Sequence, residues 1–214
     1  MTDVSELKIA LRQRVLARRK QLRRAEPEVL ASASARLVAQ VLADARWRAA
    51  RGVAAFVGVR GEPDTWALLE QTLSAGKGLW LPRVDGPRMV FWELREPADL
   101  EALERRKMGL REPAERGRSS PAPGPAEGVD LILVPGLAFS PGGLRLGFGA
   151  GHYDRAFGSR WPAARWAEAG REGARALAMG TCLEEFIVDD LPAEAHDLPM
   201  DALVSEAGVR ECPR

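Results

Sequence analysis

The stretch RLGFGAGHYDR, which begins at Arg145, places three alternating glycines among polar side chains that can do chemistry. Gly147, Gly149 and Gly151 allow the backbone to approach a ligand closely and to adopt positive φ angles. Free backbone N–H groups in such a loop can surround an anion, above all a phosphate. Arg145 can bind a phosphate through two hydrogen bonds, and Asp154 offers a hard oxygen ligand for Mg²⁺. Together, these residues suggest a site for nucleotide phosphates and magnesium.

The same residue types also have purely structural explanations. A single G-x-G-x-G run is a weak signal, because it also occurs in tight turns that bind no ligand. His152 and Tyr153 would then pack against neighbours or cap a helix. Lys8 and Arg12, four residues apart, share one helix face that either reaches the nucleotide or is solvated. Asp197 would be a turn residue. Spacing alone leaves both interpretations open.

Helices and strands that alternate along the chain must position this stretch. We expect helices over about residues 5–24, 27–47 and 64–76, and another that begins near Tyr153. We expect strands over 51–59, 78–84, 88–94, 129–139 and 201–208, and a helix followed by a strand over 169–180. This order predicts an α/β fold, a three-layer α/β/α domain with a mostly parallel sheet and helices on both faces. We expect one domain over residues 1–214, with an exposed loop over about 111–128 that is rich in Pro, Gly, Ser and Ala.

The first helix and the strand before the glycines place the candidate residues. In the first helix, one side carries Leu7, Leu11, Val15 and Leu22, and the neighbouring side carries Lys8, Arg12, Arg19 and Arg23. The glycine stretch follows the strongest apolar strand, 129–139. Ligands of parallel α/β sheets bind where strands end and helices begin, so the glycine stretch lies where a ligand would be expected.

Composition excludes several classes of protein. The net charge of +1 argues against strong attraction to nucleic acid, and no apolar stretch approaches the length that spans a membrane. Asp3 and Glu6 argue against an N-terminal targeting segment. Cys182 and Cys212 form neither a metal-binding spacing nor a disulfide framework. We therefore expect a cytoplasmic protein with no nucleic-acid or membrane partner.

Six segments together resemble the 5-formyltetrahydrofolate cyclo-ligase family, also called 5,10-methenyltetrahydrofolate synthetases. The strongest is LILVPGLAFSPGGLRLGFGAGHYDR, and the others, in the family's order, are KIALR, GEPDT, LPRVDGPRMVFWEL, GLREP and LPAEAHDLPMDALVSEAG. The resemblance implies a single α/β sandwich that converts 5-formyltetrahydrofolate to 5,10-methenyltetrahydrofolate and releases ADP and phosphate. It implies ATP as co-substrate, Mg²⁺ as cofactor and a folate with or without a polyglutamate tail. We also expect a monomer, although no sequence feature determines the oligomeric state.

The resemblance also implies roles for individual residues. The catalytic residue is Arg145. The ATP-binding residues are Lys8, Arg12, Arg145, Leu146, Gly147, Phe148, Gly149, Ala150, Gly151, His152 and Tyr153. The folate-binding residues are Val57, Glu62, Phe148, Gly149, Ala150, Gly151 and His152, and the magnesium ligands are Asp154 and Asp197. Met89, Phe91 and Trp92 either add an apolar wall to the folate site or belong to the core.

Two positions depart from the family pattern. Ala150 stands where some members have a phosphate-reaching lysine and many have glycine, and His152 stands where tyrosine is frequent. Neither change removes Arg145 or Asp154, so we retain the enzyme interpretation. The alternatives are a nucleotide- or folate-binding protein of the same fold without turnover, and an arginine-rich RNA-binding protein, which the net charge disfavours.

Overall fold

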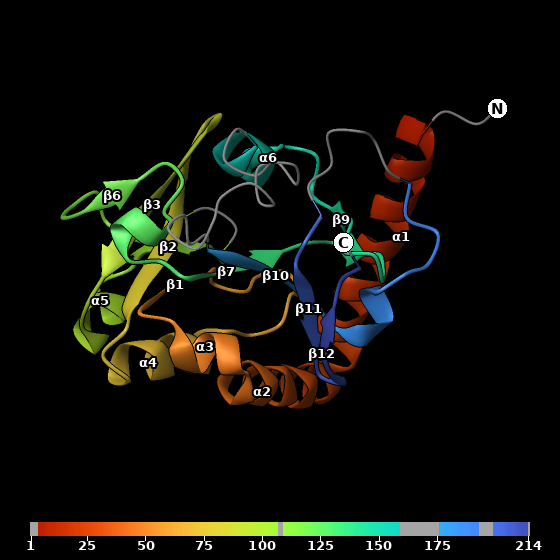
Figure 1. The fold of residues 1–214 in the computed structure, drawn as a ribbon. Coiled ribbons are helices and arrows are strands. Elements are labelled where there is room, and N and C mark those ends of the chain that lie inside the picture. The colour runs from red at the N-terminus through yellow and green to blue at the C-terminus, as the bar shows by residue number, and fades with distance from the viewer. Residues whose placement is uncertain (1–3, 107–108, 159–175, 193–198, 214) are drawn as a thin grey trace.

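The computed structural model describes residues 4–106, 109–158, 176–192 and 199–213. Its main strands are β1 (Gly52–Ala54), β2 (Gly78–Asp85), β3 (Arg88–Leu94), β6 (Ser119–Ser120), β7 (Leu131–Pro135), β10 (Leu177–Thr181), β11 (Ala202–Ser205) and β12 (Gly208–Glu211). In the described residues they form one eight-stranded sheet in the order β12-β11-β10-β7-β1-β2-β3-β6 (Figure 1). The five strands from β11 to β2 are parallel, and the outer strands β12, β3 and β6 pair antiparallel. The prediction of an α/β fold with a mostly parallel sheet is confirmed.

Helices cover both faces of this sheet. They are α1 (Val4–Ala25), α2 (Pro27–Ala43), α3 (Ala45–Ala49), α4 (Trp66–Ser74), α5 (Pro97–Glu101) and α6 (His152–Phe157). Figure 1 shows α2, α3 and α4 below the sheet and α6 above it. None of the described helices is both long enough and apolar enough to cross a membrane.

The two hydrophobic cores follow from the alternation of side chains along the central strands. In β7, Leu131 and Leu133 pack with the side chains of α2 and α4, whereas Ile132 and Val134 pack with those of α1 and α6. Successive residues of a strand point to opposite faces, so a strand buried on both faces is apolar throughout. The three-layer arrangement rests on this alternation.

Three expected strands differ from those observed. The strand expected over 51–59 ends at Ala54, and the chain beyond it turns toward a cavity. The strand expected over 129–139 is interrupted after Pro135, and β8 (Ala138–Phe139) pairs with β9 (Arg145–Leu146) as a separate hairpin. The expected last strand is followed by a second one, β12, whose edge position requires few apolar residues. The pattern of apolar residues did not reveal these strand ends, because it shows which residues are buried and not where the backbone leaves the sheet.

The segment 111–128 is not entirely the exposed loop that we expected. It contains β5 (Arg111–Glu112), which pairs with β4 (Glu104–Arg105), and β6, which extends the main sheet beside β3. Glu112 and Ser120 are buried. The Pro- and Gly-rich composition of the segment permits such two-residue strands. A single domain over residues 1–214 stays a prediction.

The first helix is rotated relative to our expectation. It buries Lys8, Leu11, Val15, Arg19 and Leu22, whereas Leu7 is 43% exposed. The expected polar side therefore does not lie wholly in solvent. Two of its cations point inward, because Lys8 lines a cavity and Arg19 donates to the carbonyls of Gly136 and Leu137 in the loop after β7.

Candidate active site

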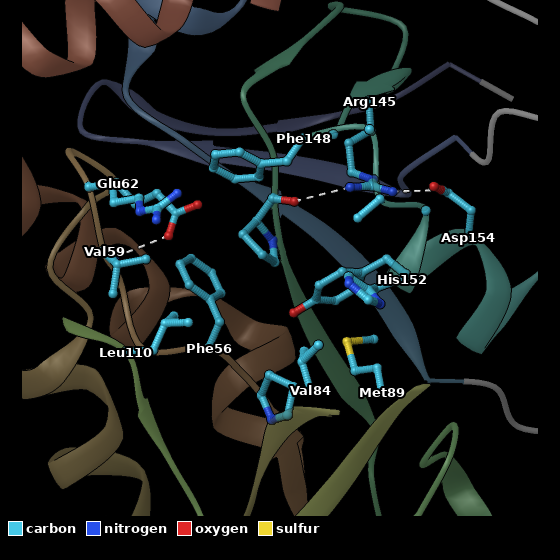
Figure 2. Close-up of a pocket in the computed structure, with 18 of the residues that line it drawn as sticks. Phe56, Val59, Glu62, Val84, Met89, Leu110, Arg145, Phe148, His152 and Asp154 are labelled. Carbon is cyan, nitrogen blue, oxygen red and sulfur yellow. Dashed lines mark hydrogen bonds and ion pairs between the residues drawn. The ribbon is translucent and has the colours of Figure 1, made fainter. Parts of the chain in front are cut away.

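A cavity of about 620 Å³ opens at the carboxyl ends of the parallel strands (Figure 2). Its walls come from α1, the loop after β1, β2, the start of β3, the β4–β5 hairpin and the glycine stretch. The predicted site residues that line it are Lys8, Arg12, Val57, Glu62, Arg145, Leu146, Gly147, Phe148, Gly149, Ala150, Gly151, His152, Tyr153 and Asp154. Asp197 lies outside the described residues. Segments from distant parts of the chain therefore meet around one cavity.

Arg145 is held at the wall by three neighbours. Its Nη2 donates to Asp154 Oδ1 at 2.6 Å, and its Nη1 donates to the carbonyl of Pro135 at 3.4 Å. The guanidinium carbon lies 5.5 Å from the centre of the Tyr153 ring. The side chain is 8% exposed, so these contacts fix the guanidinium where it borders the cavity. Figure 2 shows Arg145 and Asp154 together at one side of the site.

The glycines are required for two different reasons. Gly149 and Gly151 have φ angles of +98° and +64°, which strain any residue with a Cβ. A Cβ on Gly147 would lie 2.9 Å from Arg145 Nη1, so glycine lets the guanidinium pass. Arg12 Nε donates to the Gly147 carbonyl at 3.0 Å and ties the loop to α1. The loop is thereby held open toward the cavity, and Phe148 remains 46% exposed.

Glu62 is a buried carboxylate in the cavity wall, with 8% of the residue exposed. Its Oε2 accepts a hydrogen bond from the Val59 N–H at 3.1 Å, and its Oε1 lies 3.5 Å from Arg19 Nη1. Burial raises the pKa of the Glu62 carboxyl, and the nearby Arg19 charge offsets part of that rise. A buried carboxylate with a perturbed pKa beside a cavity is typical of a functional group.

Arg19 is a site-supporting residue that sequence reasoning missed. It is 1% exposed, donates to the carbonyls of Gly136 and Leu137, and lies over the Phe186 ring at 5.1 Å. Burial lowers its pKa. These carbonyls lie where β7 ends and β8 begins, so Arg19 compensates the break in the strand. The available signal was helical phase, since Arg19 falls in the same stripe as the apolar residues of α1.

The three residues proposed for an apolar folate wall, Met89, Phe91 and Trp92, separate into two groups. Met89 lines the cavity. Phe91 is fully buried and packs against Tyr153 and Phe157, with ring centres 6.3 and 5.6 Å apart. Phe91 therefore belongs to the core, and Trp92 is likewise absent from the described lining. Sequence could not separate Met89 from Phe91, because residues two apart on a strand point to the same face.

The described residues fit magnesium in the way that nucleotide enzymes commonly bind it. Mg²⁺ usually takes one or two protein carboxylates together with substrate phosphates and water. Asp154 supplies one carboxylate that is 39% exposed and borders the cavity. No cluster of three or more acidic, histidine or cysteine ligands occurs within the described part of the chain. Asp154 lies beside Arg145, whose guanidinium can bind a phosphate, and is thus suited to a metal that phosphates would also hold.

Comparisons with known proteins agree with this geometry. Residues 4–206 match the family model of the 5-formyltetrahydrofolate cyclo-ligase family. The chain is 36% identical over 159 residues to the 5-formyltetrahydrofolate cyclo-ligase of Mycolicibacterium smegmatis. The aligned residues cover 70% of this chain and 71% of that one. It is 30% identical over 165 residues to the Escherichia coli K12 cyclo-ligase, covering 76% and 81% of the two chains.

A solved structure is also similar over almost the entire chain. The NMR structure of Aquifex aeolicus 5,10-methenyltetrahydrofolate synthetase superposes with a TM-score of 0.75 at 30% identity, covering 97% of this chain and 94% of that one. The family match, the curated relatives and this structure all point to one group of enzymes. The chain therefore belongs to the 5-formyltetrahydrofolate cyclo-ligase family, a family of enzymes.

Proposed function

We propose that this protein converts 5-formyltetrahydrofolate to 5,10-methenyltetrahydrofolate with ATP and Mg²⁺, and releases ADP and phosphate. One observation carries the proposal. The residues suited to a nucleotide, from α1 and the glycine stretch, and the buried carboxylate suited to a pterin line the same cavity. A reaction that transfers a phosphoryl group from ATP to a folate requires this adjacency. The cytoplasmic location and the monomeric state remain predictions.

The chemistry explains why ATP is needed. A formamide is a poor electrophile and its oxygen is a poor leaving group. Transfer of the γ-phosphoryl group to the formyl oxygen releases ADP and leaves an iminium phosphate. N10 of the same folate then attacks the formyl carbon and loses its proton, the five-membered ring closes, and the C–O bond breaks to release phosphate, which takes up that proton. The second nucleophile is intramolecular, so the protein mainly has to align the reactants.

Arg145, Lys8 and Arg12 are suited to the nucleotide side of this reaction. The fixed Arg145 guanidinium can stabilise negative charge on the transferring phosphoryl group. Lys8 adds a buried cation to the wall, and Arg12 supports the Gly147 carbonyl. Magnesium, when bound through Asp154 and the phosphates, would neutralise part of the phosphate charge. Ala150 adds no charge, so this loop depends on Arg145 and α1.

Glu62 is suited to the folate. The amino group and ring N–H of a pterin form a pair of donors, which a carboxylate can accept with both oxygens. Glu62 has acceptor capacity for this purpose, because a carboxylate offers about four lone-pair sites, and the Val59 N–H and Arg19 approach one oxygen each. Arg19 and the loop backbone thereby hold the carboxylate at the cavity wall. Val57 lies on the same loop and lines the site.

The experiment that tests this function measures product. We expect the absorbance of the methenyl product to appear only when the protein, ATP, Mg²⁺ and 5-formyltetrahydrofolate are all present. Omission of each component in turn is the control. If both ligands bind stoichiometrically and no methenyl product forms, the protein is a binding protein of the same fold, and the proposed activity is wrong.

We expect affinity for 5-formyltetrahydrofolate to fall as pH is lowered from about 8 to about 5, because Glu62 must be ionised to accept the pterin donors. The loss begins at higher pH than for an ordinary glutamate, since burial raises the pKa of Glu62. Calorimetric titration across this range measures the effect. A Glu62→Gln variant should bind weakly at every pH with little slope, and equal slopes for both proteins would contradict the assignment.

The same raised pKa has the opposite effect on stability. The folded state favours protonated Glu62, so this group stabilises the fold at pH below its unfolded pKa and loses that contribution as pH rises through its folded pKa. The ionised side chain therefore costs folding free energy relative to the protonated one. A carboxylate whose ionised form improves ligand binding but lowers the stability of the fold is expected at a functional site.

A further inference from the structure

Arg111 is a cavity-lining cation with no use in the chemistry described above. It projects from β5, the second strand of the β4–β5 hairpin. Other cations of the wall are engaged, since Arg145 pairs with Asp154 and Arg12 donates to Gly147. Within the described parts of the chain, the only contact that the structure gives the Arg111 guanidinium is with an aromatic ring. Its N–H groups are therefore available for an anionic ligand.

That ring holds the guanidinium in place. The Arg111 guanidinium carbon lies 4.8 Å from the centre of the Trp66 ring, and Trp66 Nε1 donates to Glu70 Oε1 at 2.8 Å. A guanidinium that lies over an aromatic face keeps its edge N–H groups free for a planar carboxylate. Because the cation is already ordered, less conformational entropy is lost when a carboxylate binds.

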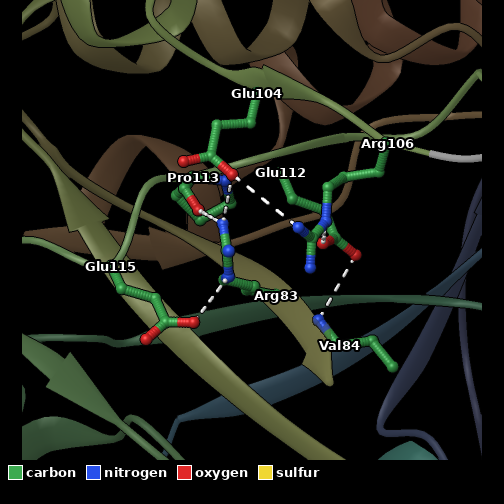
Figure 3. A network of polar contacts seen from close by, with 7 residues as sticks. All are labelled: Arg83, Val84, Glu104, Arg106, Glu112, Pro113 and Glu115. Atoms are coloured by element: carbon green, nitrogen blue, oxygen red, sulfur yellow. Dashed lines mark hydrogen bonds and ion pairs between the residues drawn. The ribbon is translucent and has the colours of Figure 1, made fainter. Parts of the chain in front are cut away.

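Polar contacts fix the hairpin that carries Arg111 (Figure 3). Glu112, whose side chain is 7% exposed, accepts from the Val84 N–H at 3.3 Å and from Arg106 Nε at 3.2 Å. Arg83 Nη1 donates to Glu104 Oε2 and to the Pro113 carbonyl, both at 2.8 Å. These bonds join β2 to both strands of the hairpin. The position of Arg111 relative to the cavity is thereby set.

The place of the hairpin identifies which anion Arg111 meets. Leu110, which precedes Arg111 in the chain, lies with Phe56 and Val59 on one side of the cavity (Figure 2). Arg145 and Asp154 lie on the other side (Figure 2). The nucleotide phosphates belong beside Arg145. A folate carries anionic groups of its own, the carboxylates of its glutamate tail, next to an apolar aminobenzoyl ring. Leu110 and Phe56 suit that ring, and the adjacent Arg111 suits a carboxylate.

We propose that Arg111 binds a glutamate carboxylate of the folate substrate and makes the enzyme selective for folates that carry this tail. The proposal rests on the proposed function, because it assigns one end of the substrate of that reaction. Arg111 is a specificity residue in this proposal, since it would contact the tail and not the reacting formyl group.

Calorimetric binding with two ligands tests the proposal without any turnover. The ligands are 5-formyltetrahydrofolate and 5-formyltetrahydropteroate, which lacks the glutamate. Loss of one charge-assisted contact in Arg111→Gln should weaken binding of the first ligand by about 10- to 100-fold and leave the second unchanged. Arg111→Lys keeps the charge without the planar fork and should lose less. Arg105→Gln is the matched control, because Arg105 is exposed and lies opposite Arg111 in the hairpin.

The outcomes separate this proposal from the proposed function. If the wild-type protein binds both ligands equally, or if Arg111→Gln weakens both equally, Arg111 does not recognise the glutamate. If wild-type protein binds neither ligand, the proposed function fails and the tail assignment fails with it. Preferential binding of the glutamate-bearing ligand that disappears in Arg111→Gln, with Arg105→Gln like wild type, supports the proposal.

Discussion

Replacing Arg145 by glutamine should reduce kcat by about 10²- to 10³-fold, the usual loss when a preorganised donor to developing charge is removed. Arg145 is already held by Pro135, Tyr153 and Asp154, so it needs no rearrangement when the phosphoryl group transfers. Steady-state assay of methenyl product measures the change. The fold should survive, because the Asp154 carboxylate that loses its partner is 39% exposed and remains hydrated.

A second arginine–aspartate pair provides the control for this variant. Arg51 Nη2 lies 2.8 Å from Asp130 Oδ1, and neither residue lines the cavity. Arg51→Gln should leave kcat within about twofold of wild type, since exposed ion pairs contribute little to stability. If Arg145→Gln raises only the KM for ATP and keeps kcat, Arg145 binds the nucleotide equally in the ground and transition states, and its catalytic role is wrong.

The fold was largely predictable where one physical signal dominates. β7 is apolar on both faces because α1 and α6 cover one side and α2 and α4 cover the other, and its sequence shows this directly. The breaks in β1 and after β7 were not predictable. They depend on hydrogen bonds from distant residues, such as those that Arg19 makes to Gly136 and Leu137. Two-residue strands such as β5 are also too short to show a period.

The candidate site was likewise predictable only in part. Local chemistry marked the glycine stretch, and the structure places its residues from Arg145 to Asp154 around the cavity. The contacts between residues of distant segments could be found only from the folded structure. The sequence does not show that Arg19 approaches Glu62, that Arg12 supports the Gly147 carbonyl, or that the β4–β5 hairpin brings Arg111 to the wall. Each of these joins segments that are far apart in the chain.

The structure also changes the alternatives for Asp154. A helix-capping role would be a purely structural explanation of Asp154, but Gly151 occupies the N-cap of α6 and Asp154 lies within the first turn. Its carboxylate accepts a short hydrogen bond from Arg145 instead. Asp154 therefore either orients Arg145 alone or also holds magnesium. The two roles differ in what they do to the magnesium dependence of the reaction.

Replacing Asp154 by asparagine should leave the fold intact and raise the Mg²⁺ concentration needed for half-maximal activity by about 10- to 100-fold. The asparagine amide oxygen can still accept the Arg145 hydrogen bond, but it lacks the charge that attracts a cation between protein and phosphates. Activity measured over a Mg²⁺ series at saturating ATP and folate tests this, with Asp130→Asn as the matched control. A lower kcat with unchanged Mg²⁺ dependence would mean that Asp154 only orients Arg145. Wild-type turnover with unchanged Mg²⁺ dependence would rule out the magnesium role, because a neutral side chain that still accepts the Arg145 hydrogen bond would then serve as well as the carboxylate.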